Sequence, residues 1–445
     1  MRFGADVLLE RLDALETIAN KPRRYLIALS GGLDSTVLAH ALAETRGRHG
    51  KQLLAIHVDH QLQADAARWS AYCRELAGRF GIESLTERVA VDTAGGSGVE
   101  AAARAARYAA LARHVDAGDW LLSAHHRNDQ AETLLLNLMR GSGPAGLAGI
   151  GAASPFAGGW LVRPLIDVSR TELEAYAAAH GLEWLDDPSN EDQRFDRNYL
   201  RHAVLPVLER RWPGAVERVA RSADLAGEAA SLLDELAAID LQGLGNRPAR
   251  IDVEGLVKLP EARQRNLLRH AIRRAGLPLP GAARLASVID SVLHAKPDAQ
   301  PLVEWPGGQL RRYRGRLYLL PPLGESVWPA GGTALAATPV ALGEGMGTLR
   351  LVPGAPRGLA AATATRGLRV RMRTGGEQIK PAGQAHTKKL KKLLQDEGVV
   401  PWMRERLPLV FAGDELVAVA DLWIAAGASS EPGTAVRWDG RPELY

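Results

Sequence analysis

Residues 25–38 read Tyr25-Leu26-Ile27-Ala28-Leu29-Ser30-Gly31-Gly32-Leu33-Asp34-Ser35-Thr36-Val37-Leu38. An apolar run with the length of a buried strand ends at Ser30, two glycines follow, and the segment from Asp34 onward has the apolar spacing of a helix. The glycines let a ligand reach backbone N–H groups, the serine hydroxyls add donors, and a helix N-terminus favours negative charge. The stretch therefore predicts a strand, an anion-binding loop and a helix, with the loop formed by Ser30, Gly31, Gly32, Leu33, Asp34 and Ser35.

Two glycines alone would favour a turn that only caps a helix. The full string Ser30 to Ser35, placed after a strand, resembles the pyrophosphate loop (PP-loop) of the N-type ATP pyrophosphatases, which split ATP into AMP and pyrophosphate. The nucleoside-triphosphatase loop is excluded because no Gly-Lys-Ser/Thr follows the glycines. The resemblance implies ATP as a substrate and activation of an acceptor by adenylyl transfer.

The chain is long enough for about three domains. Its 445 residues contain a Pro-Gly turn at Pro213-Gly214, and a second break at Pro321-Pro322 with the Gly/Ala-rich stretch 330–337. We therefore expect an α/β catalytic domain with a Rossmann-like parallel sheet and the PP-loop, a mostly helical domain, and a small basic α+β domain. Their predicted ranges are 1–213, 214–328 and 329–445.

Composition excludes several kinds of protein. Cys73 is the single cysteine, so the chain can form no internal disulfide and no paired-cysteine metal site or sulfur relay. We find no apolar run of membrane-spanning length and no signal-peptide h-region at the N-terminus. These features predict a cytoplasmic protein that does not enter a membrane. The net charge of +4 allows a nucleic-acid partner but does not require one.

Polar residues follow two further predicted strands. His57, Asp59 and His60 come at the end of the apolar run 52–60. Ligands of open parallel sheets bind outside the carboxyl ends of the strands, so we expect His57 and Asp59 beside the loop, contacting the nucleotide. A histidine at a strand end is also often structural, and that alternative stays open.

After the predicted strand 120–124 come His125, Asp129 and Glu132, spaced i, i+4 and i+7. In a helix this spacing places all three on one face, again at the carboxyl end of a strand. The alternative is a chance polar stripe on a solvated helix. The glycine-rich stretch 140–150 that follows is either a mobile substrate loop or a plain connection.

The third predicted domain contains a basic stretch. Between residues 366 and 406 there are eleven Lys or Arg against four acids, and the segment 388–394 places lysines around an apolar stripe of a predicted helix. A surface that follows nucleic-acid phosphates and an ordinary exposed helix are both compatible with this pattern.

Together these motifs resemble those of the tRNA(Ile)-lysidine synthases over most of the chain. Two departures are Asn128, where aspartate is frequent, and Gln61, where glycine is common. The Asn128 departure makes a two-aspartate metal site there doubtful. The resemblance rests on Ser30 to Ser35, His57-Val58-Asp59-His60, Arg104 with Arg107-Tyr108, Ala124 to Thr133, Arg140 to Gly143, Arg163-Pro164-Leu165, Asp187 to Asn190, Arg197-Asn198, Lys388 to Lys391 and Pro401-Trp402 with Arg404 and Pro408.

The resemblance implies ATP-dependent joining of free L-lysine to C2 of the wobble cytidine in an isoleucine tRNA with a CAU anticodon. Asp34 would orient the loop or a Mg²⁺ ion that bridges the phosphates. Asp129 and Glu132 would anchor the lysine ammonium or act as the base, and His125 would move a proton or stabilise the leaving group. Arg107 would hold the lysine carboxylate or a phosphate, and Arg197 would neutralise charge at the adenylate. Contacts to tRNA are expected from Lys388, Lys389, Lys391, Lys392 and Arg404.

Three other kinds of protein share some of these features. A related PP-loop tRNA thiolase normally needs cysteine pairs or a cluster-binding Cys-x-x-Cys, which Cys73 alone does not supply. A tRNA-binding protein with a vestigial loop is disfavoured by the intact Asp34, Asp129 and Glu132. Amidotransferase-type synthetases share the loop but work with a glutaminase, and no catalytic cysteine opens this chain. We therefore expect no glutaminase partner.

Overall fold

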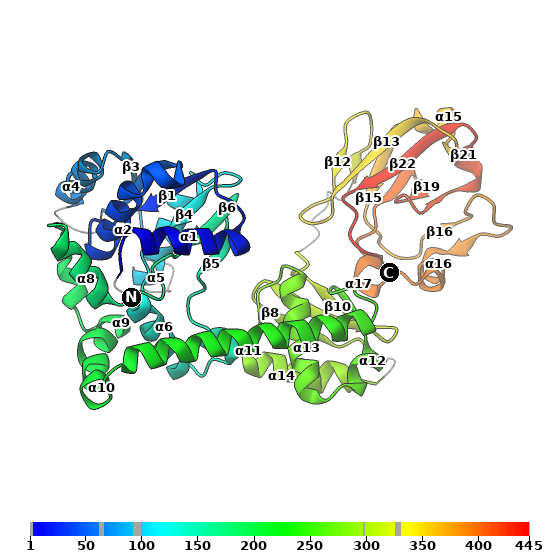
Figure 1. The fold of residues 1–445 in the computed structure, drawn as a ribbon. Coiled ribbons are helices and arrows are strands. Elements are labelled where there is room, and N and C mark those ends of the chain that lie inside the picture. Colours follow the sequence, from blue (N-terminus) through cyan, green and yellow to red (C-terminus); the bar gives the residue numbers. More distant parts are fainter. Residues whose placement is uncertain (1–2, 62–65, 92–98, 297–298, 325–330, 445) are drawn as a thin grey trace. The chain divides into compact units, whose positions relative to one another are not determined.

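The computed structural model describes residues 3–61, 66–91, 99–296, 299–324 and 331–444. The chain forms two compact units, Met1–Leu233 and Asp234–Tyr445 (Figure 1). This division falls inside the long helix α11 (Ala215–Gly243), which begins directly after the predicted boundary at 213/214. The predicted boundary at 328/329 lies outside the described residues. The three predicted domain ranges stay predictions.

A six-stranded sheet forms the middle of the first unit, in the order β3-β2-β1-β4-β6-β5. The strand β1 pairs in parallel with β2 and with β4, and β5 runs antiparallel to β6. The strand order reverses between β1 and β4, and open parallel sheets bind ligands at such a reversal. The strands are β1 (Arg24–Ala28), β2 (Gln52–Asp59), β3 (Glu83–Arg88), β4 (Trp120–Leu122), β5 (Ala153–Phe156) and β6 (Gly159–Val162).

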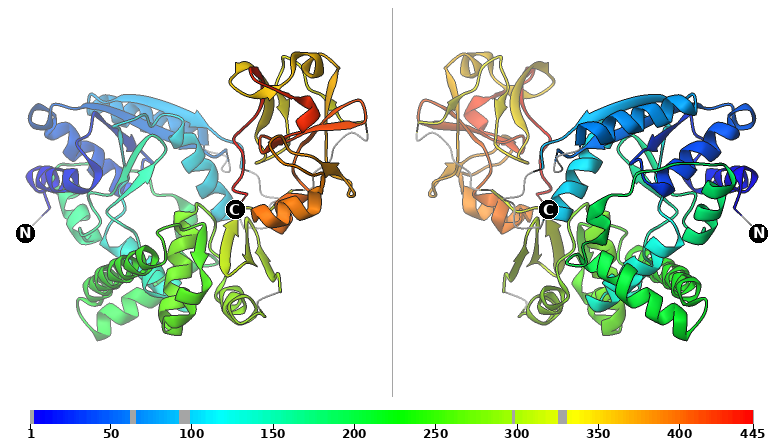
Figure 2. Two further views of the ribbon diagram at one scale, coloured as in Figure 1. Left: turned by 90° about the vertical axis from the view of Figure 1, so that its right-hand side faces the viewer. Right: turned by 90° about the vertical axis from the view of Figure 1, so that its left-hand side faces the viewer.

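Helices cover both faces of this sheet (Figures 1 and 2). Successive side chains of a strand point to opposite faces, so Tyr25 and Ile27 belong to one core with α1, α2, α4 and α8, whereas Leu26 belongs to a second core with Leu111 of α5. This burial on both faces explains the continuous apolar run of β1. The helices are α1 (Ala5–Ala19), α2 (Leu33–Glu44), α3 (Arg46–His49), α4 (Ala66–Arg79), α5 (Val99–Ala112), α6 (Arg127–Met139), α7 (Pro144–Leu147), α8 (Arg170–Ala179), α9 (Asp196–Tyr199), a π-helical turn (Leu200–Val204) and α10 (Leu205–Arg211).

The second unit begins with helices packed on a small antiparallel sheet of order β7-β10-β9-β8. The strands β9 and β10 form a hairpin, pairing antiparallel around a turn at Arg314-Gly315. The elements are β7 (Arg250–Asp252), α12 (Val253–Lys258), α13 (Glu261–Arg274), α14 (Ala282–Val288), a π-helical turn (Ile289–Leu293), β8 (Leu302–Trp305), β9 (Gly308–Tyr313) and β10 (Arg316–Leu320).

The remainder of the second unit contains two five-stranded antiparallel sheets around one core. In Figure 2 the orange helix α16 (Leu390–Glu397) lies at one end of these yellow-to-red strands. One sheet has the strands β11 (Thr333–Ala334), β15 (Leu368–Arg371), β18 (Leu409–Ala412), β19 (Glu415–Val419) and β20 (Trp423–Ile424); the other has β12 (Val340–Ala341), β13 (Thr348–Ala355), β22 (Gly433–Asp439), β14 (Gly358–Leu359) and β21 (Ser429–Ser430). Short elements complete it: α15 (Ala361–Ala364), β16 (Gln378–Ile379), β17 (Lys388–Lys389), α17 (Pro401–Arg404) and a 3-10 turn (Ala426–Ala428).

The predicted fold class is confirmed. The strand β6 ends at Val162, because Pro164 has no N–H with which to continue a ladder. Lys388 and Lys389 form β17 rather than the start of a helix. The glycine-rich stretch after Met139 includes the helical turn α7, and Asn137 donates to the Gly146 carbonyl at 2.7 Å. None of the described helices is long and apolar enough to span a bilayer.

Candidate active site

The conformation of the loop after β1 is fixed by hydrogen bonds of its own serine hydroxyls. Ser30 and Ser35 are joined through their Oγ atoms at 2.9 Å, and Ser35 Oγ also donates to the Gly32 carbonyl at 3.1 Å. Gly31 has a φ of +83°, which favours glycine. The helix α2 starts at Leu33, and the first N–H groups of a helix have no partner within it. The predicted strand, loop and helix are confirmed, and the N–H groups are available to an anion.

The underside of the loop is closely packed. Trp69 of α4 donates its indole N–H to the Ser30 carbonyl at 2.6 Å. A Cβ on Gly31 would lie 2.9 Å from Cys73 Sγ and 3.0 Å from Trp69 Nε1, both shorter than ordinary contacts. Cys73 is buried, and burial raises the pKa of its thiol to about 12. The only cysteine is therefore a packing residue beneath the loop.

Two cavities adjoin at this loop. The first, of about 450 Å³, has an apolar wall and ends at the polar groups of β2; the second, of about 670 Å³, extends over the N-terminal end of α6. Cavities of these sizes accept ligands as large as a nucleotide. Both contain Ala28, Ser30, Arg107, Ser189 and Asn190, so these residues mark the junction.

The predicted placement of β2 beside the loop is confirmed in the first cavity. His57 is buried, and its Nδ1 lies 3.0 Å from the Leu29 carbonyl, which can only accept; Nδ1 therefore has the proton and Nε2 is an acceptor. Burial lowers the pKa of His57, so the ring is neutral. Asp59 accepts a hydrogen bond from the Gln61 N–H at 2.9 Å. Both residues line the cavity, together with apolar groups such as Ile56.

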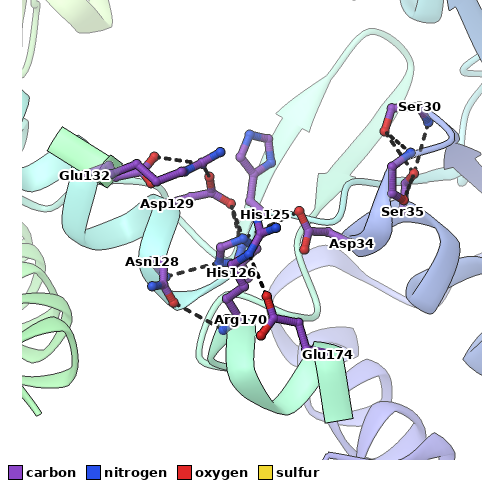
Figure 3. A network of polar contacts seen from close by, with 12 residues as sticks. Ser30, Asp34, Ser35, His125, His126, Asn128, Asp129, Glu132, Arg170 and Glu174 are labelled. Atoms are coloured by element: carbon purple, nitrogen blue, oxygen red, sulfur yellow. Dashed lines mark hydrogen bonds and ion pairs between the residues drawn. The ribbon is translucent and has the colours of Figure 1, made fainter. Parts of the chain in front are cut away.

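Beside the second cavity, the buried His126 is the N-cap of α6 (Figure 3). Its Nδ1 accepts from the Asn128 N–H, and Asp129 Oδ2 accepts from the His126 N–H at 2.9 Å. His126 Nε2 lies 3.5 Å from Asp34 Oδ2 and 3.6 Å from Asp129 Oδ2. Burial lowers the pKa of His126, but Asp129 and Asp34 together raise it above its usual value. Burial likewise opposes ionisation of Asp129, yet His126 lowers its pKa, so Asp129 is ionised.

The predicted single-face stripe is wrong for His125, because α6 begins at Arg127 and His125 precedes it. The His125 ring still lines the second cavity, and its Nδ1 contacts Ser123 Oγ at 2.7 Å. Burial lowers the pKa of His125 to about 3. His125 is consequently a neutral hydrogen-bonding group at physiological pH.

Glu132 is fully buried against two arginines. Arg201 donates to both of its carboxylate oxygens, at 2.8 and 3.1 Å, and Arg197 Nε lies 3.1 Å from Glu132 Oε2. Arg201 also approaches Asp129 Oδ1 at 3.4 Å. Burial raises the pKa of Glu132, and the ion pair with Arg201 offsets part of that shift. Glu132 thus fixes the two guanidinium groups that line the cavity.

Arg107 lies at the junction of the cavities. Its Nε is buried without a hydrogen-bond partner, and its guanidinium stacks 5.3 Å from the centre of the Tyr108 ring. An unsatisfied buried donor costs free energy unless a ligand supplies an acceptor. Arg107 is therefore available to an anionic group, and its predicted role at the lysine carboxylate or a phosphate stays a prediction.

A metal site can be tested on the described residues. Within the described ranges no three His, Cys, Asp or Glu side chains are grouped to hold a metal ion. Asp34 Oδ1 is buried without a partner at the second cavity. A single free carboxylate oxygen suits Mg²⁺ that is held mainly by phosphates and water.

Sequence reasoning assigned no role to His126 or Arg201. His126 lies within the stretch Ala124 to Thr133 that it had singled out, and Arg201 lies three residues after Arg197-Asn198. The signals available were the doubled histidine at a helix start and the four-residue spacing of Arg197 and Arg201, which places them on one helical face.

The predicted tRNA-binding residues belong to the second unit. The lysine patch, defined as Lys388, Lys389, Lys391 and Lys392, is exposed, while Leu390, Leu393 and Leu394 are buried beneath it. Arg404 is engaged within the fold: it donates to the Val399 carbonyl at 2.7 Å and to the Tyr313 hydroxyl at 2.6 Å.

Comparisons with known proteins cover nearly the whole chain. Family models described as a PP-loop domain, the TilS substrate binding domain and the TilS substrate C-terminal domain match residues 7–208, 251–318 and 368–439. The tRNA(Ile)-lysidine synthase of Alkalilimnicola ehrlichii is 44% identical over 92% of this chain and 92% of that protein. Those of Xanthomonas campestris pv. campestris (strain 8004) and Coxiella burnetii are 42% and 39% identical, over 92% and 96% of this chain and 92% and 94% of those proteins.

Proposed function

This chain belongs to the tRNA(Ile)-lysidine synthase family, and we propose that it joins free lysine to C2 of the wobble cytidine in the CAU anticodon of an isoleucine tRNA. The reaction consumes ATP, passes through an adenylated tRNA and releases pyrophosphate and AMP. Lysidine at this position changes the codon that the tRNA reads from AUG to AUA. The observation that supports this mechanism best is the meeting of two cavities at Ser30 and Arg107.

The first cavity would hold the adenosine of ATP. Its apolar wall suits a base, and the neutral His57 has an acceptor at Nε2 for the adenine amino group. The pyrophosphate would lie on the N–H groups at the start of α2, in a loop whose conformation is fixed by the Ser30 and Ser35 hydroxyls. The α-phosphate would then lie at the junction, within reach of Arg107. Asp34 would hold Mg²⁺, which would supply positive charge to neutralise the leaving pyrophosphate.

The second cavity would hold the acceptors. In the first step the cytosine C2 oxygen attacks the α-phosphorus and pyrophosphate leaves. In the second step the lysine ε-amine attacks C2, and AMP leaves with the former C2 oxygen. Asp129, which is ionised and lines the cavity, would bind the lysine ammonium and accept its proton. Arg197 and Arg201, held by Glu132, would neutralise the adenylate phosphate, and His125 would donate a hydrogen bond to it.

We further propose a cytoplasmic enzyme without a glutaminase partner. The attacking nitrogen belongs to free lysine, so the reaction needs no ammonia from glutamine. Tight contact with tRNA would come from the exposed lysine patch.

The adenylated intermediate gives a direct test. The protein is incubated with Mg²⁺, isoleucine tRNA and ATP labelled at the α-phosphate, first without lysine. We expect label to accumulate on the tRNA and to leave as AMP when lysine is added. A protein that binds tRNA without ever labelling it would contradict the proposal.

Gly31→Ala is expected to lower the rate of pyrophosphate release about 100-fold, because the added Cβ would displace Trp69 or the loop, and displacing a catalytic group by about 1 Å costs on this order. Gly50→Ala is the matched control: its φ is also positive, at +63°, but no atom lies within 4 Å of the new Cβ. It should lose only a few degrees of melting temperature and no activity. Equal rates in the two variants would remove the loop from the mechanism.

Changing all four residues of the lysine patch to glutamine is expected to weaken tRNA binding and to flatten its salt dependence. Each lost phosphate contact reduces the slope of log K against log salt by roughly 0.7 to 0.9. Losing the contacts of all four lysines would therefore reduce the slope by about 3. A double variant, Lys21→Gln with Lys51→Gln, changes charge in the first unit and should keep the slope. Filter binding between 50 and 300 mM salt measures both, and an unchanged slope would rule the patch out.

A further inference from the structure

The segment after α8 supplies one wall of the second cavity. Phe195 is the N-cap of the short helix α9, and Asn198 lies within that helix. Both line the second cavity, and neither lines the first cavity. Neither has a role in the steps above. Resting on the proposed function, we propose that Phe195 and Asn198 hold the target cytosine, with Phe195 stacking on the base and Asn198 accepting a hydrogen bond from its N4 amino group.

Phe195 presents an aromatic ring where a base must bind. Its side chain is 36% exposed and belongs to none of the buried cores of the described chain. Its backbone N–H is bonded to the Asp192 carbonyl at 3.2 Å, so the residue is anchored while the ring is free. A wobble base must leave its stack to be modified, and an aromatic side chain replaces the stacking that it loses.

Asn198 is oriented by its own amide group. Its Nδ2 donates one hydrogen to the Ser189 carbonyl at 2.8 Å and the other to the Asp192 carbonyl at 3.0 Å. Carbonyl oxygens can only accept, so the nitrogen must face the loop. Oδ1 accepts no hydrogen bond from the residues that the structure describes. Asn198 therefore offers the cavity an acceptor, with no donor left over.

An acceptor without a donor distinguishes cytosine from uracil. Cytosine presents an N4 amino donor where uracil presents an O4 acceptor, which would repel Oδ1. Holding cytosine by N4 also leaves its C2 oxygen free at the opposite end of the same edge, as attack on ATP requires. The neighbouring carboxylate of Asp192 is already bound by Arg194 Nε at 2.9 Å, so it does not compete for this role.

Two substrates and two variants test the hydrogen bond. Single-turnover adenylation is measured with isoleucine tRNA that contains at position 34 either cytidine or 2-pyrimidinone riboside, which lacks only the N4 amino group. The wild-type protein should prefer cytidine, and Asn198→Ala should reduce that preference at least 10-fold. His202→Ala is the matched control, because its Nε2 bonds the Asn190 carbonyl of the same loop at 3.0 Å without lining either cavity. It should keep the wild-type preference even if its rate falls.

The stacking is tested in parallel. Phe195→Leu should raise the KM for tRNA roughly 10- to 100-fold and leave the KM for ATP unchanged, while Phe195→Tyr should restore the wild-type value within about threefold. An unchanged base preference in Asn198→Ala, or an unchanged KM for tRNA in Phe195→Leu, would overturn the assignment while adenylation by the wild-type protein still stood. A wild-type protein that adenylates neither tRNA would instead overturn the proposed function and this inference with it.

Discussion

Asp129→Asn is expected to lower lysine transfer about 100-fold while tRNA adenylation falls less than tenfold. The amide keeps an oxygen that can accept the His126 N–H, so the start of α6 is preserved. It loses the negative charge that would bind the lysine ammonium and accept its proton. A hydrogen bond between charged groups in a partly buried site contributes about 2–3 kcal/mol, which corresponds to roughly 100-fold.

The two steps are separated by following pyrophosphate release and labelled lysine in the same single-turnover reaction. A high lysine concentration should recover part of the transfer rate if Asp129 mainly binds the ammonium, and none if it mainly accepts the proton. An Asp129→Asn protein that transfers lysine at the wild-type rate would remove Asp129 from the mechanism.

Arg201→Met is expected to lower the melting temperature of the first unit by about 6–12 °C. The substitution leaves the fully buried Glu132 with Arg197 as its remaining described cationic partner. Removing one member of a buried ion pair costs about 3 kcal/mol, and 1 kcal/mol corresponds to about 2–4 °C in a unit of this size. Arg194→Met is the control in the same region, because its only described ion pair, with Asp192, lies at the surface; a change within about 1 °C is expected.

The loss of melting temperature caused by Arg201→Met should also depend on pH. Burial raises the pKa of Glu132 even with Arg201 present, and removing Arg201 raises it further. A carboxyl group whose pKa is higher in the folded than in the unfolded state binds more protons when folded, so stability rises as pH falls. Scanning calorimetry at pH 8 and pH 6 should therefore show a smaller deficit at pH 6. Equal melting temperatures for Arg201→Met and Arg194→Met would show that the Glu132 cluster does not stabilise the fold.

The sequence predicted the features that are local. The strand, loop and helix at Ser30 depend on neighbouring residues alone, and the placement of His57 beside the loop follows from the general rule for parallel sheets. The role of Glu132 could not be predicted from its neighbours in the sequence. Its spacing from His125 and Asp129 suggested a shared role at the ligand, but its partners Arg197 and Arg201 come from a segment about 70 residues later, whose packing on α6 no periodicity indicates.

The second unit shows the same limit. The lysines at 388 and 389 read as part of a helix because they directly precede its apolar stripe at Leu390, Leu393 and Leu394. Instead they form β17, which pairs with β16 (Gln378–Ile379) and is held extended. Arg404 looked like a free cation in the sequence, whereas the ring of Tyr313, on a distant hairpin, stacks on it at 5.5 Å. In both cases the conformation or contacts of the side chains depend on partners that are distant in sequence.

The measurement that tests the central claim most directly offers the protein ATP, Mg²⁺ and radiolabelled lysine with an unmodified isoleucine tRNA that has a CAU anticodon. A parallel reaction contains the elongator methionine tRNA, which has the same anticodon. We predict that label enters the isoleucine tRNA, only when ATP is present, and does not enter the methionine tRNA. Failure to label the isoleucine tRNA while ATP is still cleaved to pyrophosphate would contradict the account, because the loop would then activate a different acceptor.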